Sequence, residues 1–166
     1  MRLSRFLPAV AAVVFLSACD LSTEPNIPAP VDPALDTYAT SLGVNIASMT
    51  KTASGLYYKD LEPLITTGVA AVVNDSIKAD YILWLTNGTK VDSSIDNGTP
   101  IEFRIGDTDV IPGFSEGFVG LKPGGRRQLV IPTQLAWGSR GSTAPGKPTV
   151  QPNANVVFEI KFLSKF

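Results

Sequence analysis

The sequence predicts one α+β domain over residues 52–166, built on a sheet of several antiparallel strands with one short helix as its cover. Three runs, at 77–85, 101–105 and 156–163, alternate apolar and polar residues with period two, which is typical of strands with one buried face. Asn-Gly pairs at 87–88 and 97–98 predict turns next to these strands.

Residues 1–18 have the pattern of a secretory signal peptide. Arg2 and Arg5 precede an apolar stretch from Phe6 to Leu16, which is shorter than the roughly 20 residues that span a bilayer. The stretch ends in Leu-Ser-Ala-Cys, which resembles a bacterial lipobox, so Cys19 is the predicted lipidation site. The alternative is that this sole cysteine is a buried free thiol. Lipidation would anchor the chain to a membrane in the bacterial cell envelope, facing the periplasm or the exterior.

A proline-rich tether and a short helical lead-in are predicted between the signal peptide and the domain. Residues 19–33 begin with the lipidated cysteine and contain four prolines and few large apolar side chains, so we expect them to be a mobile tether. In residues 34–51, apolar side chains recur at helical spacing, which predicts an amphipathic helix interrupted at Gly43. These apolar residues are Leu35, Tyr38, Leu42, Ile46 and Met49.

Within the domain, two further strands are predicted at 69–73 and around 129–131. Arg126 and Arg127 form the one notable basic cluster, and we expect this pair to be the solvated start of the second of these strands. Only residues 114–121 have a helical pattern inside the domain. This short helix is therefore the predicted cover of the sheet.

The composition excludes most familiar catalytic machinery. The chain has no histidine, which removes Ser-His-Asp and Cys-His nucleophiles, histidine acid–base catalysis and nearly all zinc sites. The sequence has no glycine-rich loop of the kind that binds phosphate between a strand and a helix. Its net charge of -1 gives no sign of the basic surface that binds nucleic acid. Asp92, Asp96, Asp107 and Asp109 do not have the spacing of a calcium loop, so we expect turn residues there and no metal or cofactor.

Rotation about an X-Pro peptide bond is a reaction that an apolar site can catalyse without proton transfer or metal. Its barrier of about 20 kcal/mol comes from amide resonance. Because the twisted amide is less polar than the planar one, a dry apolar pocket can bind it preferentially. The segment 110–132 is suited to this chemistry, since it is largely apolar and has a single carboxylate, Glu116.

Three segments together resemble the FKBP-type peptidyl-prolyl cis-trans isomerases. They are DYILWLTNGTKVDSS at 80–94, VIPGFSEGFVGLKPGGRRQLVIP at 110–132 and QPNANVVFEIKFL at 151–163, and the similarity extends over 54–166. The resemblance implies a curved antiparallel sheet of five or six strands wrapped around one short helix. It also implies proline-containing polypeptides as substrates, a role in folding exported proteins, and macrolide inhibitors of the FKBP class.

The resemblance also assigns site residues. The implied catalytic residues are Tyr81, Asp92, Ile111, Phe114, Trp137 and Phe158, and the implied substrate-binding residues are Val91, Ile101, Phe103, Val110 and Val150. Phe114 would be the pocket floor, and the Ile111 amide would donate to the substrate. Val91 and Ile101 stand where the family usually has Phe, and Trp137 where it has Tyr.

Each of these assignments has a purely structural alternative. The aromatic residues are also expected in a core, and an aspartate such as Asp92 after a strand is often a turn or cap residue. A non-catalytic binding module that kept the fold is the alternative to an isomerase.

Overall fold

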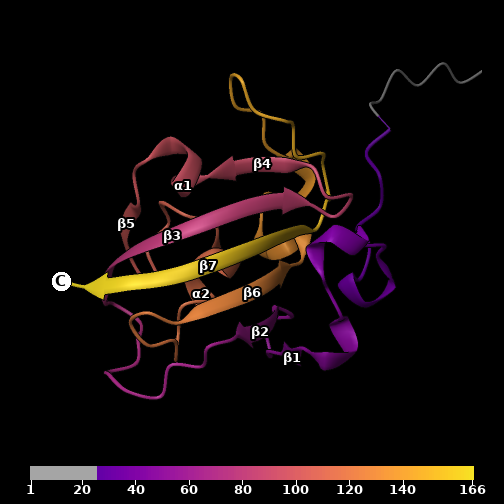
Figure 1. The fold of residues 1–166 in the computed structure, drawn as a ribbon. Coiled ribbons are helices and arrows are strands. Elements are labelled where there is room, and N and C mark those ends of the chain that lie inside the picture. The colour runs from indigo at the N-terminus through magenta and orange to yellow at the C-terminus, as the bar shows by residue number, and fades with distance from the viewer. Residues whose placement is uncertain (1–25) are drawn as a thin grey trace, which may run out of the picture.

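A computed structural model describes residues 26–166 (Figure 1). The predicted signal peptide, Cys19 and the first part of the tether lie outside the described residues. No helix within 26–166 has the length and apolar character needed to cross a membrane.

One antiparallel sheet contains all seven strands of the described chain. They are β1 (Thr50–Lys51), β2 (Tyr57–Leu61), β3 (Ser76–Leu85), β4 (Lys90–Ser93), β5 (Ile101–Arg104), β6 (Arg126–Ile131) and β7 (Val156–Lys165). The order is β1-β2-β6-β7-β3-β4, and β5 pairs with the first half of β3 while β4 pairs with its second half. The predicted fold class is confirmed. The described chain has seven strands instead of the expected five or six, and one of the seven, β1, is a two-residue strand at the edge of the sheet.

The two long central strands, β3 and β7, position the core. They pair antiparallel along almost their whole length, with Leu83 opposite Phe158. Side chains of one parity from both strands are buried on the concave face of the sheet. They include Ile77, Ala79, Leu83, Phe158, Ile160 and Phe162.

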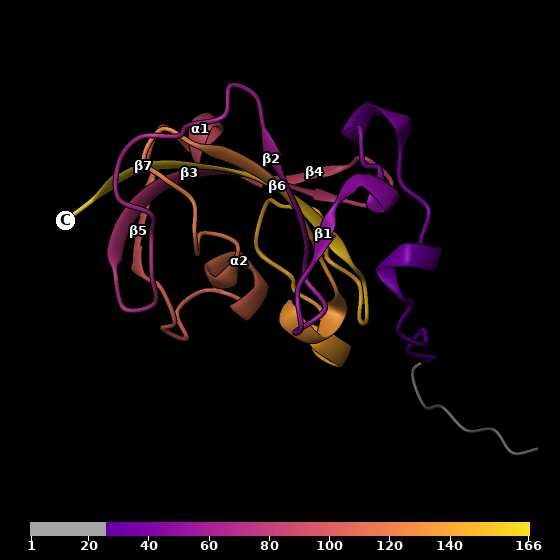
Figure 2. The ribbon, with the colours of Figure 1, turned by 90° about the horizontal axis from the view of Figure 1, so that it is seen from below.

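The helix α2 (Pro112–Glu116) lies under the concave face of the sheet (Figure 2). It begins two residues before the predicted helix and is shorter, because Pro112 fits a first helical position and the chain turns at Gly117. A Cβ on Gly113 would lie 2.4 Å from Ile131 Cγ2, and one on Gly117 would lie 2.4 Å from Leu129 Cδ1. The two glycines therefore allow the helix backbone to rest directly on β6.

A second helix, α1 (Ser94–Asn97), was not expected. Ser93 is its N-cap and accepts from the Asp96 N–H, and Gly98 ends it in the left-handed region at φ 68°. The turn predicted at Asn97-Gly98 is therefore the one that ends this helix. Two 3-10 turns, Thr133–Leu135 and Gly138–Arg140, follow β6.

Residues 69–73 form a loop, and the strand predicted there is absent. Ala71 exchanges backbone hydrogen bonds with the segment after α2: its N–H donates to Leu121 O at 2.8 Å, and its carbonyl accepts from Gly120 N at 2.9 Å. Residues 69–73 pair with no strand of residues 26–166. Their valines are exposed, whereas Ala71 is buried.

Arg127 is buried, so the expectation of a solvated arginine pair is wrong for this residue. The residue is 5% exposed. The guanidinium donates to Asp60 Oδ1 at 2.5 Å and to the carbonyls of Gly117 and Val119 at 2.9 and 3.0 Å. These last carbonyls follow α2 and have no helical partner, so Arg127 fastens the end of the helix to β6.

The lead-in contains three 3-10 helices, so the predicted amphipathic helix is absent. They are Pro33–Leu35, Thr40–Leu42 and Ile46–Ser48. Gly43 ends the second in the left-handed region, at φ 59°, and extended residues separate the three. The lead-in still buries apolar side chains against the outer face of the sheet, where Figure 1 shows it in purple beside β6 and β7. There Tyr38, Leu42, Val44, Ile46 and Met49 cover Tyr57, Val130 and Val157.

The last part of the predicted tether contacts the domain. Asn153 Nδ2 donates to Pro28 O at 2.7 Å, and Asn155 Nδ2 donates to Val31 O at 3.0 Å. Pro33 is buried. The expectation of a free tether therefore does not hold for residues 28–33, because asparagines just before β7 bind its carbonyls.

We expect Leu42→Ala to lower the free energy of unfolding by about 1–2 kcal/mol, since a half-buried leucine leaves its contacts with β6 and β7. Leu35→Ala is the matched control, because Leu35 is 81% exposed. Urea unfolding of both variants measures the difference. Equal stabilities would show that the lead-in does not stabilise the domain.

Candidate active site

A cavity of about 210 Å³ opens on the concave face beside α2. Its lining residues are Tyr81, Leu83, Asp92, Ile101, Asp109, Val110, Ile111, Phe114, Trp137 and Phe158. All six residues implied to be catalytic are among them, together with Ile101 and Val110. The structure thus brings together residues from β3, β4, β5, α2, β7 and the connecting loops.

Three of the implied substrate-binding residues lie outside this cavity. Val91 and Val150 line a smaller neighbouring cavity of about 80 Å³, and Phe103 is buried in the core. Leu83 and Asp109 also line the main cavity, although neither was predicted to be a residue of this site. Leu83 belongs to the alternation of β3 and is indistinguishable there from a core residue.

Phe114 is the centre of an aromatic cluster that forms the cavity floor. It is only 3% exposed. Its ring centroid lies 5.1 to 5.6 Å from those of Tyr81, Phe103, Phe118 and Phe158. Tyr81 and Phe118 meet Phe114 edge-on, an arrangement that aromatic rings prefer. Phe114 is therefore both a core residue and the floor, so the two interpretations of the aromatics coincide.

The loop into α2 presents a free amide at the cavity. Ile111 is the N-cap of α2, and its carbonyl accepts from the N–H groups of Phe114 and Ser115 at 3.1 and 3.2 Å. Its own N–H has no acceptor within the described part of the chain. This N–H is available to donate to a bound carbonyl, as the family resemblance implies.

Asp92 is held in place by four neighbours. Oδ2 accepts from the Tyr81 hydroxyl at 2.8 Å, and Oδ1 accepts from Asn97 Nδ2 at 3.1 Å and from the Ser93 N–H at 2.8 Å. The Lys147 ammonium forms an ion pair with Oδ1. Burial raises the pKa of Asp92, but these hydrogen bonds outweigh it, so the pKa lies below its ordinary value. Asp92 lies in β4 and faces the cavity, and the adjacent Ser93 caps α1.

Tyr81 donates a hydrogen bond to Asp92, and its own pKa is shifted as well. Burial raises the pKa of its hydroxyl well above the usual range, and the hydrogen bond to Asp92 and the Asp92 charge add to the rise. Tyr81 thus remains protonated while Asp92 remains ionised. Neither group changes its protonation state near neutral pH.

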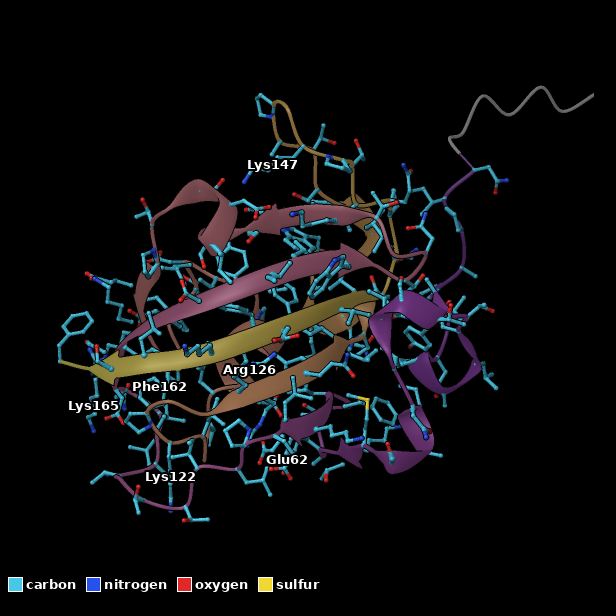
Figure 3. All side chains as sticks on the ribbon, viewed as in Figure 1. Glu62, Lys122, Arg126, Lys147, Phe162 and Lys165 are labelled. Atoms are coloured by element: carbon cyan, nitrogen blue, oxygen red, sulfur yellow. The ribbon has the colours of Figure 1, made fainter. Side chains whose placement is uncertain are left out.

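Lys147 comes from a flap at 141–150, and no sequence pattern pointed to it. Two backbone hydrogen bonds join the ends of the flap: Ser142 N donates to Val150 O at 2.8 Å, and Val150 N donates to Ser142 O at 2.9 Å. Figure 3 shows Lys147 on this flap, close to β4. The ion pair with Asp92 therefore joins the flap to the cavity wall.

We expect Lys147→Met to raise the KM for X-Pro peptides several-fold, since the flap loses its ion pair with Asp92 and a half-buried carboxylate loses a cation. Lys147→Arg is the control, because it keeps the charge and reach. Steady-state kinetics at low and high salt measure the effect. A wild-type KM in both variants would show that the ion pair does not order the site.

The rate of isomerisation should be nearly flat between about pH 6 and 8, because the chain has no histidine and the Asp92–Tyr81 pair does not titrate there. A pH series of kcat/KM on one X-Pro peptide measures this. A bell-shaped profile centred near neutrality would refute a mechanism without proton transfer.

Comparison with known proteins identifies the family. The family model for FKBP-type peptidyl-prolyl cis-trans isomerases matches residues 68–163, more than half of the chain. The chain belongs to the FKBP-type peptidyl-prolyl cis-trans isomerases. The predicted enzyme class is thereby confirmed.

Relatives at nearly 40% identity are similar over the same region. An FK506-binding protein of Neisseria meningitidis serogroup B is 38% identical over 112 residues, which are 68% of this chain and 97% of the relative. The chloroplastic isomerase FKBP16-3 of Arabidopsis thaliana is 39% identical over 112 residues. This match covers 68% of the chain but only 49% of the plant protein, so the chain spans about half the length of that relative.

Solved structures share the fold. The crystal structure of AtFKBP13 aligns with a TM-score of 0.63 at 35% identity, covering 72% of this chain and 99% of that one. FkpA from Escherichia coli aligns with a TM-score of 0.59 at 33% identity, covering 70% and 51%. The FKBP fold of the domain is therefore shown by structure as well as by sequence.

Proposed function

We propose that this enzyme isomerises X-Pro bonds in exported polypeptides and thereby assists their folding, by binding the twisted amide in the cavity above Phe114. The single observation that carries this proposal is the floor of packed aromatic rings beside the free Ile111 N–H. A proline ring matches the apolar floor, and the N–H matches a substrate carbonyl.

The chemistry asks little of the protein beyond shape and polarity. Twisting the amide removes its resonance, so the less polar twisted form gains more from an apolar cavity than the planar form does. Phe114 and Phe158 supply apolar surface for the proline ring. The Ile111 N–H orients the peptide, and Trp137, which also lines the cavity, has an indole N–H that can donate.

Asp92 contributes by positioning. It is ionised and fully engaged by Tyr81, Asn97 and Lys147, so it is unsuited to carry a proton. Its carboxylate accepts from the Tyr81 hydroxyl and so fixes the Tyr81 side chain, whose ring is nearly perpendicular to that of Phe114. The hydroxyl oxygen of Tyr81 can still accept a hydrogen bond. Loss of Asp92 would therefore loosen one wall of the cavity.

Unfolded or folding proline-containing polypeptides are the substrates we propose, and macrolides of the FK506 type are the proposed inhibitors. The name of the Neisseria relative, an FK506-binding protein, supports the second expectation. Ile101 is smaller than the Phe usual in the family, so one wall of this cavity would accept bulkier groups.

We further propose that Cys19 is lipidated and holds the domain close to a membrane of the bacterial envelope. The first hydrogen bond between the described part of the tether and the domain is at Pro28, nine residues after Cys19. Nine fully extended residues span roughly 30 Å. The anchored domain would then remain within that distance of the bilayer, near polypeptides that emerge from it.

Phe114→Leu should lower kcat/KM ten- to a hundredfold, because losing about 1.4–2.8 kcal/mol of transition-state binding has that effect. Phe162→Leu is the matched control, because it also replaces a buried aromatic ring with a smaller aliphatic side chain, but Phe162 does not line the cavity. A protease-coupled assay on several X-Pro peptides measures both. If the wild-type domain accelerates none of them, the chain is a non-catalytic binding module.

The mature chain should begin at a diacylated or triacylated Cys19. Intact-mass measurement of protein extracted from bacterial membranes tests this, and Cys19→Ala should abolish processing without changing the fold of 52–166. An unmodified Cys19 in the mature protein would contradict the anchor.

A further inference from the structure

A second cavity, of about 310 Å³, lies beside the first and has no role in the chemistry described above. Its apolar lining comes from Val73, Ile105, Val110, Pro112 and Val119. They belong to three segments: the 69–75 loop, the loop from β5 to α2, and α2 with the turn after it.

Backbone contacts hold these three segments together. Asn74 N donates to Ile105 O at 2.9 Å, and Gly120 N donates to Ala71 O at 2.9 Å. The Gly106 N–H donates to Ser115 Oγ at 2.8 Å, and Ser115 is buried. The cavity walls are thus tied to one another, and the cavity is a fixed feature of the fold.

The rim of the cavity exposes apolar side chains to water. Val73 is 58% exposed and Val119 is 40% exposed. Val72 beside them is also exposed. An exposed apolar cluster around a concavity is typical of a ligand or protein contact site.

The second cavity adjoins the proline cavity at Val110. Val110 lines both, and along the same loop Asp109 lines the first and Asp107 the second. An extended peptide advances about 3.3 Å per residue. A chain with its proline ring on Phe114 that continues across Val110 would therefore place a nearby residue in the second cavity.

The charged side chains that line the two cavities are all carboxylates, and Lys147, which pairs with Asp92, lines neither. Asp107 and Glu116 line the second cavity and the exposed Asp109 lines the first, whereas no lysine or arginine is among the described residues lining either. Glu116 is held by the Ser54 hydroxyl at 2.8 and 2.9 Å. These carboxylates would attract a cationic side chain and repel an anionic one.

We propose that the second cavity is a substrate subsite for an apolar side chain flanked by a lysine or arginine, within about three residues of the isomerised proline. The proposal rests on the proposed isomerase function and names the class of sequence that this enzyme prefers. The valines of the second cavity would select the apolar side chain, and the carboxylates would select the basic residue next to it.

The test compares a short X-Pro peptide with the same peptide extended by Leu-Lys, Leu-Glu or Gly-Ser, on the N-terminal or the C-terminal side, by NMR exchange spectroscopy of the cis and trans forms. On one side, we expect kcat/KM with Leu-Lys to exceed that with Gly-Ser about tenfold, and Leu-Glu to lose most of the gain. Val73→Ser combined with Val119→Ser should remove the gain. Asp107→Lys should reverse the preference between Leu-Lys and Leu-Glu.

Two controls separate the subsite from the catalytic cavity. Val69→Ser alters an exposed valine of the same loop that lies outside the cavity lining, and should keep the wild-type preference. Turnover of the short peptide should be unchanged in every variant. Equal turnover of all extended peptides by the wild type, or an equal loss for short and extended peptides in the variants, would overturn the subsite. Absence of short-peptide turnover in the wild type would instead refute the isomerase function itself.

Discussion

The direct contact of α2 with β6 is the constraint on which the rest of the structure depends. Gly113 and Gly117 have no side chains to separate the helix from Ile131 and Leu129, so α2 lies against the sheet and Phe114 enters the core. Arg127 fastens the carbonyls at the end of the helix. A helix of five residues cannot cover the whole concave face, and the uncovered part is the cavity in which the chemistry is proposed.

Both faces of the sheet around this cavity are stabilised by segments outside the helix. The lead-in covers Val130 and Val157 on the outer face, opposite the part of the sheet that carries Phe158. The flap reaches Asp92 through Lys147. The lead-in thus packs on the outer face of the strands that carry the aromatic side chains, and the Lys147–Asp92 ion pair holds the flap at the cavity wall. Both contacts suit a site that must keep one shape, complementary to a twisted amide.

Local pattern was sufficient wherever a segment had regular periodicity, as in β3 and β7, and family resemblance located most of the cavity lining. Prediction from local pattern failed where contacts with distant segments of the chain determine the structure. The lead-in has helical spacing yet adopts 3-10 turns, because it follows the outer surface of β6 and β7. Arg127 has the sequence of a solvated residue but meets buried carbonyls, and Lys147 lies 55 positions from Asp92. Neither partner is visible in a local window.

The central claim is that the proline of a substrate lies on Phe114, in the cavity between α2 and the sheet. Isotope-filtered NOE spectroscopy of the labelled domain with an unlabelled X-Pro peptide tests it most directly. The account predicts contacts from the proline ring protons to the rings of Phe114, Tyr81 and Phe158. Proline contacts confined to the outer face of the sheet, or to the flap alone, would contradict it.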